Sequence, residues 1–121
     1  MSEAELPPQI QEQLARLQQM QQTLQAVVSQ KQRLEIELSE TDKAVSELEK
    51  ITDEAPVYKM VGGIMIRAER QGLLTELKDR KELLNTRVTV LAKQEDRART
   101  RVKEIQDSLQ QRLAPPGARP S

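Results

Sequence analysis

The stretch VYKMVGGIMIR, residues 57–67, decides the fold because it is the only part of the chain with the pattern of β-structure. Strand-forming apolar residues lie on both sides of Gly62 and Gly63, and two glycines permit the positive φ values of a two-residue hairpin turn. A turn at these glycines places Val61 opposite Ile64. The glycines do not indicate a phosphate-binding loop, which needs a longer glycine pattern, usually with a lysine, where a strand meets a helix.

The hairpin predicted over 57–68 has more apolar surface than it can cover by itself. One face carries an apolar series with a lysine among it: Val57, Lys59, Val61, Ile64, Ile66 and Ala68. The other face carries Tyr58, Met60, Met65 and Arg67. A two-stranded ribbon is marginal in water, and its bare edges invite pairing with other chains. We therefore expect an obligate oligomer in which the hairpins of several subunits close a shared β-barrel.

Heptad patterns on both sides of the hairpin predict two long helices, over 9–55 and 73–113. The seam expected in the first helix is Ile10, Leu14, Leu17, Gln21, Leu24, Val27, Lys31, Leu34, Leu38, Thr41, Val45 and Leu48. Two successive steps of three near residues 24–27 predict a stammer, which overwinds a coiled coil locally. The seam expected in the second helix alternates steps of four and three without a break: Leu77, Lys81, Leu84, Val88, Leu91, Glu95, Ala98, Val102, Ile105, Leu109 and Arg112.

The charges of the two halves favour pairing of these helices within one chain. Residues 1–56 carry 5 basic and 11 acidic side chains, whereas residues 57–121 carry 14 basic and 8 acidic ones. An antiparallel coiled coil that pairs Leu48 with Leu77 would bring Ile10 opposite Leu113 at the far end. The expected fold is thus mostly α, a single domain over 1–121 with flexible tails at 1–8 and 114–121, and polar seam residues fix its register at some cost in stability.

Composition excludes several classes of function. Aromatic residues make up 1% of the chain, so a compact core of normal size is not expected. The chain has no Cys and no His, which excludes thiolate nucleophiles, His-based acid–base catalysis and zinc fingers, and fits a reducing, cytoplasmic location. We expect neither an enzyme nor a cofactor. No signal peptide or membrane span is expected either, because the N-terminus has no basic and apolar regions and no apolar run is long enough.

The order of these elements resembles prefoldin subunits of the β type over the whole chain. The most specific part lies in the hairpin, at Val57, Tyr58, Lys59, Val61 and Gly62, after the acidic stretch ITDEAP. A single hairpin matches the β type, because the α type carries two hairpins and a longer linker. The chain length is similar to that of archaeal β subunits, although some eukaryotic β-class subunits look alike.

The resemblance implies an ATP-independent holdase chaperone. Prefoldins of this kind assemble from two α and four β subunits, whose hairpins form a double β-barrel, and their coiled-coil tips bind unfolded polypeptides and deliver them to a group II chaperonin. The resemblance assigns assembly to nine residues of the hairpin: Val57, Tyr58, Met60, Val61, Gly62, Gly63, Ile64, Met65 and Ile66. It assigns client binding at the tips to Leu6, Ile10, Leu14, Leu17, Ile105, Leu109 and Leu113.

Two other functions are compatible with a coiled coil. A scaffold or tether without chaperone activity is the alternative, but a tether does not need a hairpin with two apolar faces. A nucleic-acid-binding helix would use Arg97, Arg99, Arg101 and Lys103. These basic residues point several ways around the helix and have no stacking aromatics beside them, so we expect no nucleic-acid partner. The tip leucines, in turn, could simply hold the two helices together.

Overall fold

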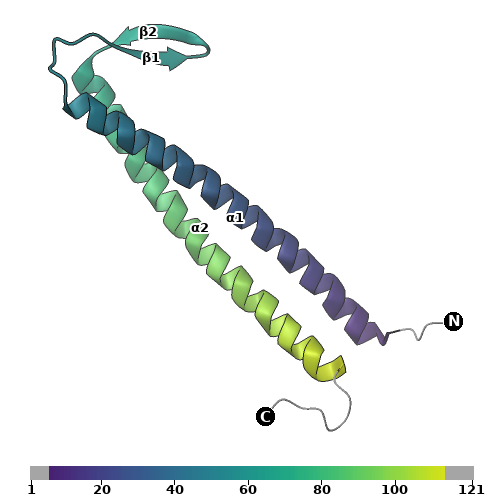
Figure 1. Cartoon of the computed structure of the whole chain (residues 1–121). Helices are drawn as coiled ribbons and strands as arrows, with labels where there is room; N and C mark the ends of the chain where they lie inside the picture. Colours follow the sequence, from purple (N-terminus) through teal and green to yellow (C-terminus); the bar gives the residue numbers. More distant parts are fainter. Residues whose placement is uncertain (1–5, 114–121) are drawn as a thin grey trace. The chain divides into compact units, whose positions relative to one another are not determined.

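The computed structural model describes residues 6–113. The elements follow the order helix α1 (Pro8–Glu49), strand β1 (Val57–Val61), strand β2 (Ile64–Ala68) and helix α2 (Arg70–Leu113) (Figure 1). Two long helices joined by one antiparallel hairpin confirm the predicted fold class. The predicted tail 114–121 and residues 1–5 of the predicted tail 1–8 lie outside the described residues. The barrel requires other chains and stays a prediction.

The chain falls into two compact units, and each contains a stretch of both helices. The hairpin unit, Lys31–Val90, holds the end of α1, the hairpin and the start of α2. The terminal unit consists of the described residues within Met1–Gln30 and Leu91–Ser121. Each unit buries its own apolar cluster where α1 and α2 pack together.

Helix α1 has an unbroken heptad seam, so the stammer predicted near residues 24–27 is wrong. The buried and half-buried positions at its start are Ile10, Gln13, Leu17, Met20 and Leu24. Steps of three and four alternate through these residues, as they do on to Leu48. Leu14 and Gln21, which were expected in the seam, are both exposed. The prediction chose Leu14 over its neighbour Gln13 because leucine is the more hydrophobic residue. The structure keeps Gln13 in the seam because a continuous 3.5-residue repeat keeps one face of α1 toward α2.

The seam of α2 follows the predicted positions from Leu77 to Leu109. Leu84 is completely buried, and Leu91, Ala98, Ile105 and Leu109 are each at most 8% exposed. The last predicted position, Arg112, is exposed, and its guanidinium instead donates a hydrogen bond to Gln9 Oε1 at 3.3 Å. Truncation of a completely buried leucine such as Leu84 to alanine would cost about 2–5 kcal/mol of stability.

Helix α1 ends at Glu49, six residues before the end predicted at residue 55. The chain then makes a turn in which the Ala55 N–H donates to the Thr52 carbonyl at 3.1 Å. Ile51 folds back onto the apolar cluster of the hairpin unit. Thr52 and Asp53 are poor helix formers, and the contacts of Ile51 and Asp53 with the rest of the unit outweigh helix propensity here.

Helix α2 begins at Arg70, three residues before the predicted start at residue 73. The first intrahelical bond runs from the Leu73 N–H to the Glu69 carbonyl at 2.9 Å. Gly72, taken from the sequence as the residue before the helix, therefore lies inside its first turn. A glycine is tolerated there because the first-turn N–H groups have no intrahelical partner in any case.

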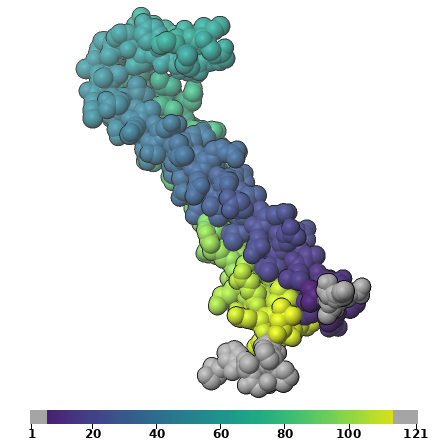
Figure 2. Space-filling model, turned by 45° about the vertical axis from the view of Figure 1, so that its right-hand side comes forward, coloured from purple at the N-terminus to yellow at the C-terminus, as the bar shows by residue number. Residues whose placement is uncertain are grey.

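The base of the hairpin packs on the end of the helix pair. Val57 joins the buried cluster of Val45, Leu48 and Leu74, with Ala68 against it. Gly62 and Gly63, at the opposite end of the hairpin, are exposed. The turn that joins β1 to β2 stands clear of the helices in Figure 1, and the hairpin forms part of the teal lobe at the upper end of the molecule in Figure 2. The hairpin unit thus anchors one end of the hairpin and exposes the other.

Candidate functional site

The hairpin has the predicted register and the predicted excess of apolar surface. Tyr58 pairs with Arg67, Met60 with Met65, and Val61 with Ile64. Gly62 and Gly63 have φ values of 55° and 83°, which fit a type I′ turn and disfavour any side chain there. Outside the anchored base, the apolar side chains on both faces are 43–68% exposed: Tyr58, Met60, Val61, Ile64, Met65 and Ile66.

Val57 is the exception among the residues expected to mediate assembly. It is 8% exposed and belongs to the buried cluster of its own chain. Its role in this structure is to anchor the hairpin. The remaining apolar residues of the set form what we call the assembly surface: Tyr58, Met60, Val61, Ile64, Met65 and Ile66.

The register also fixes which backbone groups the hairpin offers at its edges. Val61 and Ile64 flank the two-residue turn, so they form a hydrogen-bonded pair, and bonded and non-bonded pairs alternate away from the turn. Met60 and Met65 are therefore a non-bonded pair whose N–H and C=O groups point outward. Outward-pointing donors and acceptors at the edge of a sheet are a template for another strand.

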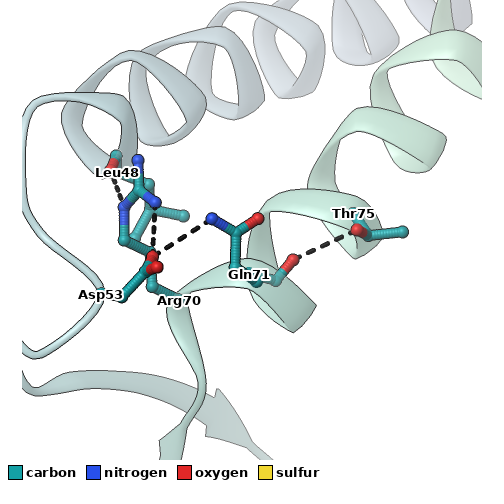
Figure 3. A network of polar contacts seen from close by, with 5 residues as sticks. All are labelled: Leu48, Asp53, Arg70, Gln71 and Thr75. Carbon is teal, nitrogen blue, oxygen red and sulfur yellow. Dashed lines mark hydrogen bonds and ion pairs between the residues drawn. The ribbon is translucent and has the colours of Figure 1, made fainter.

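Ion pairs and hydrogen bonds hold the hairpin and the helix ends together. Lys59 Nζ lies 3.0 Å from Glu76 Oε1, which links β1 to α2. At the joint, the Arg70 guanidinium donates to the Leu48 carbonyl and to Asp53 Oδ1, both at 2.7 Å (Figure 3). Gln71 Nε2 donates to the same carboxylate oxygen at 3.1 Å. The hydrogen bonds from Arg70 and Gln71 lower the pKa of Asp53 below its ordinary value of 3.8.

The terminal unit buries three of the seven residues expected at the tips and half-buries a fourth. Ile10, Ile105 and Leu109 are 4–8% exposed, and Leu17 packs on them together with Met20. Ile10 lies against Ile105 and Leu109, so the predicted pairing of Ile10 with Leu113 is wrong. The start of α1 therefore lies against residues of α2 that come before Leu113 in the sequence. The hydrogen bond between Gln9 and Arg112 agrees with this register.

The other three tip residues are exposed. Leu6, Leu14 and Leu113 are 40%, 38% and 55% exposed, and none of them belongs to the apolar cluster of the terminal unit. Leu14 is exposed because the seam passes through its neighbour Gln13. The structure thus divides the seven predicted residues into a group that packs between the helices and an exposed group outside the apolar cluster.

Gln13 was not expected in the seam, and it places a polar pair next to the apolar cluster of the terminal unit. Its Nε2 donates to Ser108 Oγ at 3.2 Å, while its Oε1 is buried and accepts no hydrogen bond from the described residues. A buried acceptor without a partner costs free energy. Strict alternation of three and four, counted backward from Leu24 through Met20 and Leu17, would have identified Gln13 from the sequence.

The basic residues near the end of α2 pair with neighbouring acids on the same helix. Arg99 lies 2.7 Å from Glu95, Lys103 lies 3.8 Å from Asp107, and Arg101 lies 3.9 Å from Glu104. These pairs connect positions three or four apart on one helix, and the three basic side chains are 57–79% exposed, as expected for solvated groups. Each of these three basic residues thus has an acidic side chain beside it.

Other features of the described residues give no sign of a catalytic or metal site. No group of three or more acidic side chains is placed to hold a metal within residues 6–113. None of the helices in that range combines the length and the apolar character that crossing a bilayer requires. Ile36, Leu83 and Val90 are exposed apolar residues that lie on the helices of the hairpin unit, away from the hairpin.

Comparison with known proteins places this architecture among characterised relatives. The family model described as "Prefoldin subunit" matches residues 11–115. A protein of Methanothrix thermoacetophila named "Prefoldin subunit beta" is 49% identical over 109 residues, which cover 90% of this chain and 91% of that protein. The protein of the same name from Archaeoglobus fulgidus is 44% identical over 111 residues, covering 92% of this chain and 96% of the relative.

A solved structure agrees in fold as well as in sequence. The crystal structure of the prefoldin beta subunit from Thermococcus strain KS-1 superimposes with a TM-score of 0.82 at 39% sequence identity. The match covers 93% of this chain and 98% of that chain.

Proposed function

Because the chain belongs to the prefoldin family and is similar to its β-type subunits over nearly its whole length, we propose that it is a holdase subunit that binds unfolded polypeptides and keeps them from aggregating without ATP. As a prefoldin-family chaperone subunit it assembles with other prefoldin subunits. The arrangement proposed is a hexamer of two α-type and four β-type subunits, located in the cytoplasm, with no enzymatic activity and no cofactor.

The observation that carries the assembly proposal is the exposure of the hairpin on both faces. The assembly surface offers six apolar side chains that are 43–68% exposed, next to outward-pointing backbone groups at both strand edges. A shared barrel would bury the side chains and pair the edges at once. A simple tether, which is the alternative function, would not require such a surface.

Client binding is proposed for the terminal unit. Leu6, Leu14 and Leu113 offer apolar contacts to an unfolded chain without any rearrangement. The ends of a helix pair also open more readily than its middle, which would add Ile10 and Leu109 to the contact area.

Each contact between a leucine or isoleucine of the terminal unit and a client is weak and has little sequence preference. Several subunits that bind one client together would gain affinity, because every contact after the first is intramolecular. Release to a group II chaperonin then needs no nucleotide.

The assembly proposal is tested by placing charges on the assembly surface. The double variant Ile64→Asp, Ile66→Asp is expected to keep its helix content by circular dichroism and to lose the hexamer in native mass measurement with a co-expressed α-type subunit. Ile36→Asp is the matched control, since Ile36 is equally exposed at 61% but lies on α1. A hexamer of normal mass from the double variant would contradict a barrel built from hairpins.

The client-binding proposal is tested by removing both helix ends. A chain without residues 1–17 and 106–121 is expected to assemble normally and to lose suppression of client aggregation. Full suppression by the shortened chain would exclude the terminal unit from the mechanism. Addition of ATP is expected to change neither client binding nor release by the assembled protein alone.

A further inference from the structure

The joint between α1, the hairpin and α2 contains one charged side chain that touches two of the elements meeting there. Arg70 is the first residue of α2, and its side chain is 14% exposed. Its Nε donates to the Leu48 carbonyl in the last turn of α1, and a terminal nitrogen donates to Asp53 in the connection between α1 and β1 (Figure 3). The guanidinium fork thus links the end of α1 to the start of α2 and to the segment that leads into the hairpin.

Arg70 is in an unfavourable place by local rules. The N-terminus of a helix carries a partial positive charge and favours acidic residues, and its C-terminus favours basic ones. Helix α2 begins with a cation and has no acidic residue in its first turn, while α1 has no basic residue in its last turn. The contacts across the joint resolve both conflicts, because Arg70 meets the carbonyl end of α1 and Asp53 accepts a hydrogen bond from Gln71 near the start of α2. Glu69 just before α2 and Lys50 just after α1 relieve the conflicts only in part, because Arg70 itself still lies at the positive end of its helix. A local conflict that a tertiary contact helps to resolve points to a role for that contact.

Few other contacts restrain the segment between Glu49 and β1. Ile51 packs on the apolar cluster of the unit, and Val57 anchors the strand that follows. Lys59 and Glu76 form an exposed ion pair further along the hairpin, and exposed pairs are weak. The side chain of Arg70 is 14% exposed, against 36% for Lys59 and 57% for Glu76, and its two hydrogen bonds are short, at 2.7 Å each.

We propose that Arg70 is a positioning residue for assembly, which fixes the direction in which the hairpin leaves the helix pair. The inference rests on the proposed function, because a barrel closed by several hairpins accepts only a narrow range of hairpin directions. Without the link, each hairpin would populate several directions, and each contact between subunits would have to restrict them again. Ordering of flexible segments at an interface weakens binding, whereas pre-organised ones bind more tightly.

The test compares two arginines that bridge α1 and α2 in the same unit. Arg70→Met removes the proposed link, whereas Arg80→Met removes an ion pair between Arg80 and Glu37 that does not touch the joint. Native mass is measured over a dilution series with the α-type subunit. Arg70→Met is expected to raise the protein concentration needed for half-assembly about tenfold or more, because each subunit interface must then order a hairpin that is no longer pre-organised. Arg80→Met is expected to raise it less than about twofold, as for an exposed pair.

A second measurement reads the hairpin direction itself, independently of assembly strength. The chain has no cysteine, so spin labels attach only at Ser46→Cys on α1 and Met65→Cys on β2. Labelled chain is mixed with excess unlabelled chain, and the distance distribution between the labels is recorded. We expect a narrow distribution in the parent and in Arg80→Met, and a clearly broader one in Arg70→Met. Arg70→Lys, which keeps the charge but not the planar fork, is expected to broaden it as well.

The outcomes separate this inference from the proposed function. If Arg70→Met assembles at the parent's concentration with an equally narrow distribution, Arg70 does not position the hairpin, although the assembly proposal stands. If the parent chain does not assemble with any prefoldin subunit, the proposed function fails and the inference about assembly fails with it. The label distances then still decide whether Arg70 sets the hairpin direction within the chain.

Discussion

Gln13 donates a hydrogen bond to Ser108 Oγ at 3.2 Å, across the seam of the terminal unit and next to its buried apolar cluster. The pair joins α1 to α2, but it also leaves Gln13 Oε1 buried with no donor among the described residues. This polar pair is a weak layer in an otherwise apolar part of the seam.

Replacement of both partners by apolar residues is expected to close the terminal unit more firmly. In the double variant Gln13→Leu, Ser108→Ala, the buried acceptor disappears, which stabilises the chain by about 1–2 kcal/mol. Amide hydrogen exchange of residues 10–20 and 102–109 should slow accordingly. If the cluster must open to bind clients, suppression of aggregation should fall at the same time.

Thr41→Val is the matched control for that variant. Thr41 is buried in the seam of the hairpin unit, where its hydroxyl donates to the Glu37 carbonyl at 2.8 Å. This variant should leave aggregation suppression unchanged. Equal suppression by the parent and the Gln13 double variant would show that the cluster does not need to open.

The exposed leucines can be tested without disturbing the seam. The double variant Leu14→Ser, Leu113→Ser is expected to change stability by no more than about 0.5 kcal/mol per site, because neither side chain packs in the cluster. Suppression of client aggregation should fall several-fold, since every weak contact counts in multivalent binding. Ile36→Ser removes an even more exposed apolar side chain, in the hairpin unit, and should suppress aggregation like the parent. If Ile36→Ser suppressed aggregation less well than the leucine double variant, client binding would not lie in the terminal unit.

Strand pairing between subunits can be separated from side-chain packing at Met65. Proline at this position removes an outward-pointing N–H, and an edge strand tolerates proline there. Met65→Pro should therefore keep the helix content and lose the hexamer by native mass. Met65→Ala loses the side chain but retains the N–H, so it should still assemble. Similar assembly of both variants would argue against backbone pairing along β2.

Acid is expected to weaken the joint through Asp53. Hydrogen bonds from Arg70 and Gln71 lower the pKa of this carboxyl in the folded chain, so its ionised form stabilises the fold. That contribution is present above the unfolded-state pKa, near 3.8, and is lost as the pH falls through the lower folded-state value. Urea unfolding of the parent and of Asp53→Asn should therefore differ most at neutral pH and converge in acid.

The pKa of Lys81 is shifted in the opposite direction from that of Asp53, so its effect on stability has the opposite pH dependence. The hydrogen bond to Asp42 raises the pKa of Lys81 above its ordinary value of 10.5. Its contribution to stability is present below that pH and is lost as the pH rises through the folded-state pKa. The difference between the parent and Lys81→Met should thus shrink in strong base. A difference between parent and Asp53→Asn that persists unchanged into acid would contradict the role given to the Asp53 carboxylate.

The hairpin and the two helices could be predicted from the sequence because they depend on local patterns. Gly62 and Gly63 lie between two strand-forming runs and favour a two-residue turn, so the register followed from their position. The heptad repeat of α2 was continuous and specified its seam from Leu77 to Leu109. The excess of apolar surface on the hairpin was also visible, since two strands cannot cover themselves.

Only the tertiary structure decided the features that depend on contacts between distant segments. Leu14 is exposed and Gln13 lies in the seam because one continuous seam must face α2, a condition that outweighs the hydrophobicity of a single residue. Helix α1 stops at Glu49, next to the place where Arg70, some twenty positions later, meets the carbonyl of Leu48 and the carboxylate of Asp53. No sequence window contains both sides of such a contact, so the division of the tip residues into buried and exposed groups, and the joint itself, required the folded chain.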